Sequence, residues 1–391
     1  MAGPASRIVA LDALRGVGIL GILVVHIQLF AMPLAARSNP TAYGDLHGAN
    51  GAVWLATWVL ADGKFIAVFA MLFGAGIVML ARRQAAAGLP AAPPHYRRMA
   101  ALLVVGALHA YLLWYGDMLV TFALCGALVF PHRDQPPARL LVTGFAFLAV
   151  APLLSSALAW AAPDVLAPTD TARELIAYRG GWLLQQTHRV PTAWTLETSY
   201  FALRGAWQTT GLMLLGMGLF GLGVLTGERP ARWYVTLALG GLGAGVPLML
   251  WSARRAFATH WDPVDRLLVG IHLVYWGNLL VGLGWVGVIV LLARHGAVPS
   301  AVLAVGRTAL SNYLLATVLC TSVFYGHGLG LFGSVDRVGQ IAIVALVCAT
   351  QLVAAPWWLA RFSMGPIEWV LRWATRGQRV PLRLTTPEPA A

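Results

Sequence analysis

The stretch LDALRGVGILGILVVH (residues 11–26) opens with an acid and a base, Asp12 and Arg15, and ends in a histidine after ten uncharged residues. On a helix, the eleven steps from Arg15 to His26 return to within about 20° of the starting azimuth and rise about 16 Å. Asp12 lies one turn before Arg15, so their charged groups can pair. All three polar side chains therefore share one helix face. In a bilayer, Arg15 would lie near one headgroup layer and His26 about half-way across.

The composition indicates a membrane protein. Of the 391 residues, 59% are hydrophobic and 11% are charged, whereas soluble domains carry about 25% charged residues. The net charge of +12 does not indicate a nucleic-acid partner, because the basic residues form short clusters between apolar runs and not a stripe with interleaved aromatics. We therefore expect an all-α, polytopic integral membrane protein whose main partner is the lipid bilayer.

The apolar runs predict about ten transmembrane helices. If the N-terminus is cytoplasmic, 17 arginines fall on the inner side and nine on the outer side, with Lys64 at an outer boundary. This excess predicts that both termini are cytoplasmic. The expected spans are residues 12–33, 64–81, 98–115, 118–131, 139–162, 207–226, 233–252, 269–293, 300–323 and 338–360.

Two longer polar segments complete the expected organisation. A transmembrane helical domain covers residues 1–362 and includes an outer loop, residues 163–206, in which RELIAYRGGWLLQQ has apolar residues at helical spacing. Residues 363–391 are expected to be a basic cytoplasmic tail with a disordered, Pro-rich end. The three cysteines lie in apolar runs without CxxC spacing or a histidine at metal-ligand spacing, so no metal site and no disulfide are predicted.

A second helix repeats the opening pattern. RMAALLVVGALH places Arg98 and His109 eleven residues apart, although arginines gather at inner helix ends in any case. The span after Asp117 has only about 13 apolar residues, or about 20 Å of helix, against a core of about 30 Å. The turn at Asp117 is therefore expected to lie below the outer surface, where irregular backbone survives only inside protein or beside water. We expect a wet pocket near His109.

Several segments resemble the YeiB-like family of bacterial inner-membrane proteins. They include RIVALDALRGVGILGILVVH (7–26), GALHAYLLWYGDMLVTFALCG (106–126) and VGRTALSNYL (305–314). The family is grouped with transmembrane acyltransferases, among them sugar O-acyltransferases and heparan glucosaminide N-acetyltransferase. Their opening helix resembles this one in having Asp, Arg and, after ten further residues, His. The resemblance implies a multi-pass protein of the bacterial inner membrane. YeiB-like proteins often have Asn where His26 stands here.

The resemblance implies a membrane-embedded acyltransferase that moves an acyl group from cytoplasmic acyl-CoA to an acceptor at or across the membrane. A neutral imidazole can remove the proton from an attacking hydroxyl or amine, so His26 and His109 are candidate bases. Each could instead be an interhelical hydrogen-bond partner. Asp117 could orient an imidazole, as in a hydrolase triad, or simply cap the next helix. Acetyl-CoA is the first donor to expect, while the acyl chain and the acceptor stay unidentified.

The donor's phosphates predict a cationic site at the inner surface, because arginine binds phosphate oxygens bidentately. Arg15, oriented by Asp12, and Arg98 are candidates, although the positive-inside signal alone also explains inner-end arginines. A second group of candidates for this donor site consists of Arg307, Ser311 and Asn312. These residues could equally be ordinary contacts between membrane helices.

Two other functions fit the same residues. A transporter or channel would use intramembrane histidines and arginines for solute binding or proton relay. A membrane scaffold that binds a partner protein would need no buried histidine. A homodimer is also expected, because enzymes of the wider superfamily often pair.

Overall fold

The computed structural model describes residues 8–161, 170–378 and 380–383. These residues form helices, turns and coil. The β-pairing within them is limited to one isolated bridge between Phe362 and Arg383. The predicted all-α fold class is therefore confirmed.

Six helical segments of the described chain are long and apolar enough to cross a membrane, or seven if a bent pair counts as one span. The bent pair is α14 (Ser300–Arg307) and α15 (Ala309–Phe324), which meet at 91°. The six are Val9–Ala31 (α1), Gly48–Ala86 (α3 with α4), Pro137–Ala161 (α7), Ala231–Ala258 (α11), Pro263–Arg294 (α12 to α13) and Arg337–Leu359 (α16).

The ten expected spans are not confirmed, because several apolar runs form short helices. The segment after Asp117 gives the apolar helix Leu119–His132, shorter than a span as the sequence predicted. The composite segments divide into α3 (Gly48–Leu60) and α4 (Lys64–Ala86), and into α12 (Pro263–Asp265) and α13 (Ile271–Arg294). The other helices are α2 (Leu34–Ser38), α5 (Ala92–Leu108), α6 (Leu119–Val129), α8 (Thr171–Arg179), α9 (Trp182–Thr195), α10 (Ala206–Gly221) and α17 (Pro366–Arg376). Tighter or wider turns are Phe130–His132 (3-10) and His109–Leu113, Leu196–Gly205 and Arg266–Gly270 (π).

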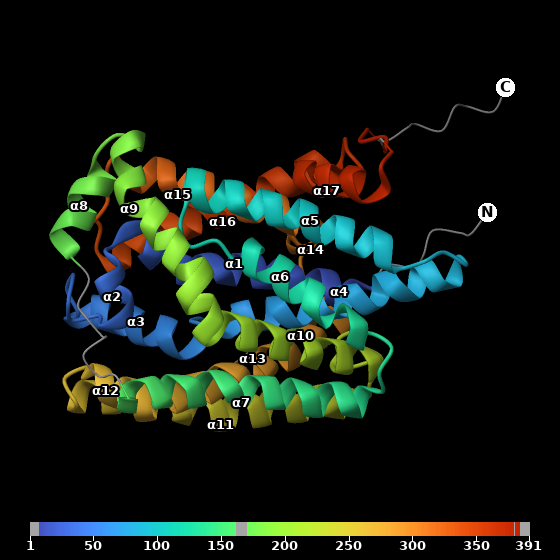
Figure 1. The fold of residues 1–391 in the computed structure, drawn as a ribbon, viewed down its shortest axis with the longest axis horizontal. Helices are drawn as coiled ribbons and strands as arrows, with labels where there is room; N and C mark the ends of the chain where they lie inside the picture. The colour runs from blue at the N-terminus through green and yellow to red at the C-terminus, as the bar shows by residue number, and fades with distance from the viewer. Residues whose placement is uncertain (1–7, 162–169, 379, 384–391) are drawn as a thin grey trace.

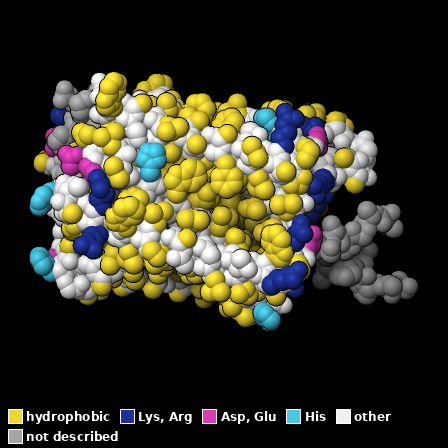
Figure 2. All heavy atoms as spheres, turned by 90° about the horizontal axis from the view of Figure 1, so that it is seen from below, with side chains coloured by type: hydrophobic (Ala, Val, Ile, Leu, Met, Phe, Trp, Pro, Cys, Tyr) yellow, Lys and Arg dark blue, Asp and Glu magenta, His cyan; other side chains and the backbone are white. Residues whose placement is uncertain are grey.

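Most helices run along the long axis of the molecule, with α7 and α11 on one side and α5, α15 and α16 on the other (Figure 1). The most apolar windows of α1 and of α3–α4 are 67% buried, whereas those of α7, α11 and α16 are 28% buried. The first group therefore forms the centre of the bundle and the second its outer ring. Figure 2 shows the result: apolar side chains cover the middle of one face and charged side chains lie towards its two ends.

Glycines allow α1 and α14 to approach closely. A Cβ at Gly16 would lie 2.1 Å from the carbonyl oxygen of Val302, and one at Gly306 would lie 2.0 Å from that of Asp12. Small residues permit such backbone contacts between membrane helices, where packing and not the hydrophobic effect drives association. The contact fixes α1 against the bent pair.

The chain begins and ends its described part at one end of the bundle, here called the termini end, and α2, α8 and α9 lie at the opposite end (Figure 1). The expected amphipathic helix of the outer loop is divided at Gly180–Gly181 into α8 and α9, and residues 162–169 lie outside the described chain. Within the expected tail, Pro366–Arg376 forms α17, which packs against α5 and α15. The Pro-rich end, residues 384–391, lies outside the described residues.

Candidate functional site

His109 lies where α5 stops being a regular helix. It begins a π-helical turn that ends at Leu113, and Trp114 then takes an extended backbone conformation. Such π-turns occur frequently at functional sites, because the extra residue per turn redirects the side chains. The change of direction allows the chain to return towards His109 eight residues later, at Asp117.

The structure brings Asp117, His109 and Thr317 into one hydrogen-bonded chain. The carboxylate oxygen Oδ1 of Asp117 lies 2.7 Å from Nδ1 of His109, and Nε2 of His109 lies 3.0 Å from the Thr317 hydroxyl oxygen. The side chains of His109 and Asp117 are each 1% exposed. A carboxylate, an imidazole and a hydroxyl in this order orient one ring nitrogen towards a group whose proton it can accept.

Asp117 fulfils both of the roles that the sequence left open. Its second carboxylate oxygen, Oδ2, accepts the backbone N–H of Val120 at 2.8 Å and so caps α6, while Oδ1 contacts His109. Residues 116–118 of the turn are half-buried, while the side chains of His109 and Asp117 are enclosed. Because the ring and the carboxylate are enclosed, however, the wet pocket expected at His109 is not seen at these two side chains.

His26 lies near the same aromatic pair, Trp114 and Tyr313, as His109. Its ring centroid is 4.9 Å from Trp114 and 6.5 Å from Tyr313, whereas that of His109 is 6.2 Å and 5.2 Å from the same two rings. Among the hydrogen bonds of the described residues, none involves the His26 ring, and its contacts are aromatic. The two histidines are therefore neighbours with different surroundings.

The two arginines of the repeated pattern both lie towards the termini end of the bundle, near enough for their charges to interact. Arg15 Nη1 lies 3.3 Å from Asp12 Oδ1, which confirms the predicted contact one turn apart. Arg98 lies within electrostatic reach of Arg15, and its guanidinium stands 5.4 Å from the centre of the Phe73 ring. Helix α1 contributes Arg15 and His26, whereas α5 contributes Arg98 and the π-turn that follows it contributes His109.

Ser311 and Asn312, two of the expected donor-binding residues, are engaged within the protein. The Glu368 carboxylate accepts the backbone N–H groups of Leu310, at 2.8 Å, and Ser311, at 3.2 Å, and also the Ser311 hydroxyl. Asn312 Nδ2 donates to the carbonyl and hydroxyl oxygens of Thr308 at 3.0 and 2.8 Å. These contacts close the start of α15, directly after Arg307 and the sharp bend.

A buried ionic group on α1's other flank was missed by the sequence reasoning. Lys64, expected at an outer boundary, lies inside the 39-residue helical segment, is fully buried and donates its ammonium to the Trp58 carbonyl. Nearby, Arg37 Nη2 bonds to Asp62 Oδ1 at 2.6 Å. The adjoining cavity, of about 10 Å³, has room for about one water. The sequence did not predict this burial, because the expected span begins at Lys64, whereas α3 continues the helical segment before it.

Thr317, Trp114 and Tyr313 were also missed as site residues. Thr317 lies one turn after Tyr313 on α15 and is also within 3.4 Å of the Tyr313 carbonyl, an ordinary contact for a threonine in an apolar helix. The sequence around Thr317 explains the bond to Tyr313 but gives no sign of the contact with His109, which lies 208 residues earlier in the chain. For Trp114, the sequence offered one sign of a site residue: two large aromatic residues, Trp114 and Tyr115, directly precede the turn at Gly116 and Asp117.

Comparisons with known proteins place the chain among proteins of undetermined role. Residues 219–378 match a family described as "Protein of unknown function (DUF418)". The chain is 32% identical to the uncharacterized protein YeiB of Escherichia coli, covering 94% of this chain and 96% of YeiB. It is 28% identical to the uncharacterized protein YxaH of Bacillus subtilis, with 94% of each covered. No solved structure matches.

Proposed function

The chain belongs to the YeiB-like family, and we propose that it is a membrane-embedded acyltransferase in which His109 is the general base. The observation that carries the proposal is the buried hydrogen-bonded chain from Asp117 through His109 to Thr317. Ionisable groups inside a membrane protein are costly to bury and are usually retained for function. A buried structural imidazole would also need hydrogen-bond partners, but the order carboxylate, imidazole, hydroxyl is the one that general-base catalysis uses.

The chain of contacts assigns each ring nitrogen a task. An ionised carboxylate can only accept, so the Nδ1–H of His109 donates to Asp117 and Nε2 keeps its lone pair. Nε2 then removes the proton from an acceptor hydroxyl or amine as that group bonds to the thioester carbonyl carbon. The C–S bond breaks, and the imidazolium returns the proton to the departing thiolate. The products are an acylated acceptor and free CoA.

Thr317 marks the position that the acceptor must reach. Its hydroxyl lies 3.0 Å from Nε2 of His109, which is the distance at which a general base abstracts a proton. Because the site is enclosed here, the acceptor reaches Nε2 only after Thr317 moves. The 91° bend between α14 and α15 supplies a place for that movement, since hinges lie at the ends of helices.

The arginine group at the termini end is the proposed donor site. Eleven helical rises separate Arg15 from His26 and Arg98 from His109, about 16 Å along each axis. The pantetheine arm of CoA is long enough to bridge that gap between a phosphate and a thioester. Asp12 orients Arg15. This arrangement requires the termini end to face the cytoplasm, where acyl-CoA is found.

One observation favours a second function, proton-coupled transport. Broken membrane helices such as the α14–α15 pair commonly surround the substrate sites of transporters, and the His109–Asp117 pair could relay protons. Transport would move a solute without forming free CoA. The two functions are therefore separated by whether a thioester is consumed.

The direct test uses inside-out membrane vesicles that contain the protein and radiolabelled acetyl-CoA. We expect label in a non-CoA product together with release of free thiol. His109→Ala should lower both by about 10²- to 10⁴-fold, the usual contribution of a general base. His295→Ala, at an exposed position, is the matched control and should be unchanged. Equal thiol release from wild type, His109→Ala and empty vesicles, with acetyl-CoA and longer acyl-CoAs, would refute the proposal.

A further inference from the structure

A groove of about 320 Å³ opens between α3 and α11 towards the opposite end of the bundle. Its lining includes the apolar side chains of Leu55, Leu250, Trp54 and Phe257, with one charged residue, Arg254. Leu55, Leu250 and Phe257 remain exposed on the surface. This α3–α11 groove is separate from the His109 site and plays no part in the proposed transfer.

The wall of the groove is rigidly packed. The Trp54 ring stacks on Trp58 at 5.7 Å and meets Phe257 and Trp261 edge to face at 5.5 and 5.9 Å. Trp261 reaches this cluster because it and His260 both take positive φ, 59° and 50°, a conformation that residues other than glycine rarely adopt. A backbone held in this way by its packing is one sign of a site whose shape matters.

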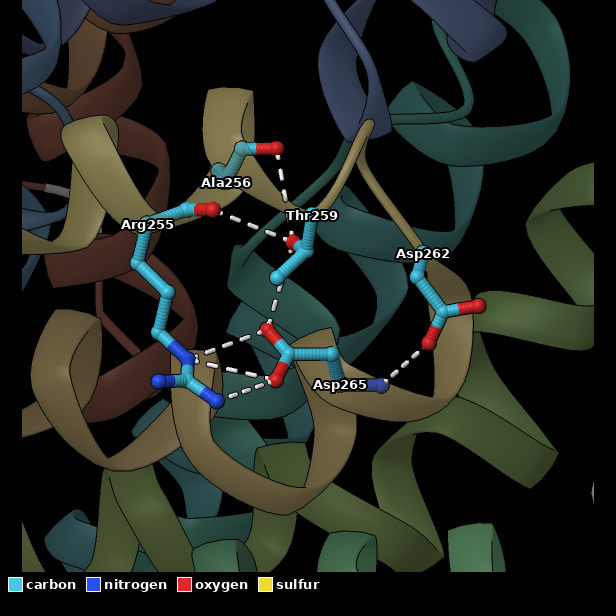
Figure 3. Close-up of polar contacts among 5 residues, drawn as sticks. All are labelled: Arg255, Ala256, Thr259, Asp262 and Asp265. Carbon is cyan, nitrogen blue, oxygen red and sulfur yellow. Dashed lines mark hydrogen bonds and ion pairs between the residues drawn. The ribbon is translucent and has the colours of Figure 1, made fainter.

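Figure 3 shows how the charge of Arg255, near the end of α11, is paired with Asp265. Asp265 accepts from Arg255 Nη2 at 2.5 Å and from Arg255 Nε at 3.2 Å, and Thr259 lies 3.4 Å away. The charge of Arg255 is thereby balanced. Among the described residues no ion pair involves Arg254, which is exposed and lines the groove.

The one charged residue in the lining of the groove lies nearer the end of the bundle than the deepest apolar residues. Helix α11 runs towards the opposite end, so Leu250 lies about 6 Å deeper in the bundle than Arg254. Helix α3 runs inward from the same end into α4 (Figure 1), which places Leu55 deeper than Gly51 by a similar distance. The groove therefore has an apolar deep part at Leu55 and Leu250 and one cation nearer the end of the bundle, beside the apolar Phe257. An anionic lipid of that leaflet carries its acyl chains and its charge in the same order.

We propose that the α3–α11 groove binds an anionic phospholipid of the leaflet at the opposite end, with one acyl chain along Leu55 and Leu250 and the phosphate group on Arg254. Apolar burial provides contact with any lipid, whereas a guanidinium pairs with phosphate and favours a net negative headgroup. A zwitterionic lipid carries the same phosphate with a compensating cation. The groove should therefore prefer phosphatidylglycerol to phosphatidylcholine.

The test uses the full chain in phosphatidylcholine vesicles doped with a photoactivatable lipid that carries a diazirine at mid-chain. Labelled peptides are mapped by mass spectrometry. Phosphatidylglycerol should label the peptides of α3 and α11 about fivefold more than phosphatidylcholine with the same diazirine, since one arginine near a charged surface contributes about 1 kcal/mol. Equal labelling by the two lipids would overturn the proposal.

Two variants locate the site. Arg254→Gln should reduce phosphatidylglycerol labelling to the phosphatidylcholine level, whereas Arg232→Gln, an exposed position at the other end of α11, should leave it unchanged. Leu55→Trp fills the deep part and should lower labelling by both lipids. If Arg254→Gln keeps the wild-type preference, the phosphate is held elsewhere and the proposal is wrong.

Discussion

The surroundings of His26 and His109 differ although the two residues are placed by the same local pattern. Each lies eleven residues after an arginine, and both contact Trp114 and Tyr313. His26 lies within the uninterrupted helix α1, whereas His109 begins a π-turn. That interruption returns Asp117 to the ring. Helical spacing can therefore bring an imidazole to mid-depth, but an interruption of the backbone is what supplies its carboxylate.

The largest effect expected while both rings remain is that of Asp117→Asn. Asparagine keeps an oxygen to cap α6 but can present an N–H to Nδ1, which would reverse the tautomer and leave Nε2 protonated. Transfer should fall about a hundredfold or more, measured as initial rates of thiol release. Asp134→Asn, at an exposed loop position, is the control. Full activity in Asp117→Asn would remove the distinction between the two histidines.

Arg15→Ala tests whether α1 binds the phosphates of the acyl-CoA donor together with α5. Loss of a charge-assisted phosphate contact should raise the KM for acyl-CoA about tenfold with little change in kcat. Arg139→Ala, an exposed arginine at the start of α7, should leave KM unchanged. A fall in kcat at constant KM would show that Arg15 acts on the reacting groups and not on the donor's phosphates.

Thr317→Val should have a smaller effect, because the hydroxyl only orients Nε2 before the acceptor arrives. One neutral hydrogen bond contributes about 0.5–1.5 kcal/mol, so we expect a few-fold to tenfold loss of kcat and near-complete recovery in Thr317→Ser. A valine variant with no activity and a serine variant that retains labelled acyl groups covalently would instead identify this position as a nucleophile.

The local spacings were predictable from the sequence, and the contacts across the bundle were not. The Asp12–Arg15 pair, the short helix after Asp117 and the all-α fold follow from helix geometry and composition. Thr317 and Glu368 join segments far apart in the chain, and one sequence contains no information on such pairing. The ten expected spans are not confirmed for a related reason: buried apolar helices in a bundle need not be long enough to cross it.

The smallest effect on transfer is expected at Glu174, in the layer that covers the end of α1. Burial raises the pKa of this carboxyl to about 7, although the Leu34 N–H, 2.9 Å from Oε2, opposes the shift. A raised acid pKa means that the folded state binds the extra proton. The protonated Glu174 carboxyl therefore stabilises the folded state fully below about pH 4.5, and this contribution is lost as the pH rises through about 7.

Hydrogen exchange, corrected for the intrinsic pH dependence, should show α2 better protected at pH 5.5 than at pH 8, and Glu174→Gln should remove the difference. Protection of residues 109–118 should not change with Glu174, because the carboxylate that contacts His109 is Asp117. If the protection of α2 and that of residues 109–118 changed together with Glu174, the two segments would be coupled, which would contradict this prediction.

The most direct test makes the same substitution at both histidines. His109→Asn and His26→Asn each keep a hydrogen-bonding side chain and remove the basic nitrogen, and both are assayed for acyl transfer in matched vesicles. Donor binding is followed by the thermal shift with acyl-CoA. We predict that His109→Asn loses about 10²- to 10⁴-fold in turnover while the thermal shift remains, and that His26→Asn stays within about threefold of wild type. Loss of turnover in His26→Asn with retention in His109→Asn would contradict the account.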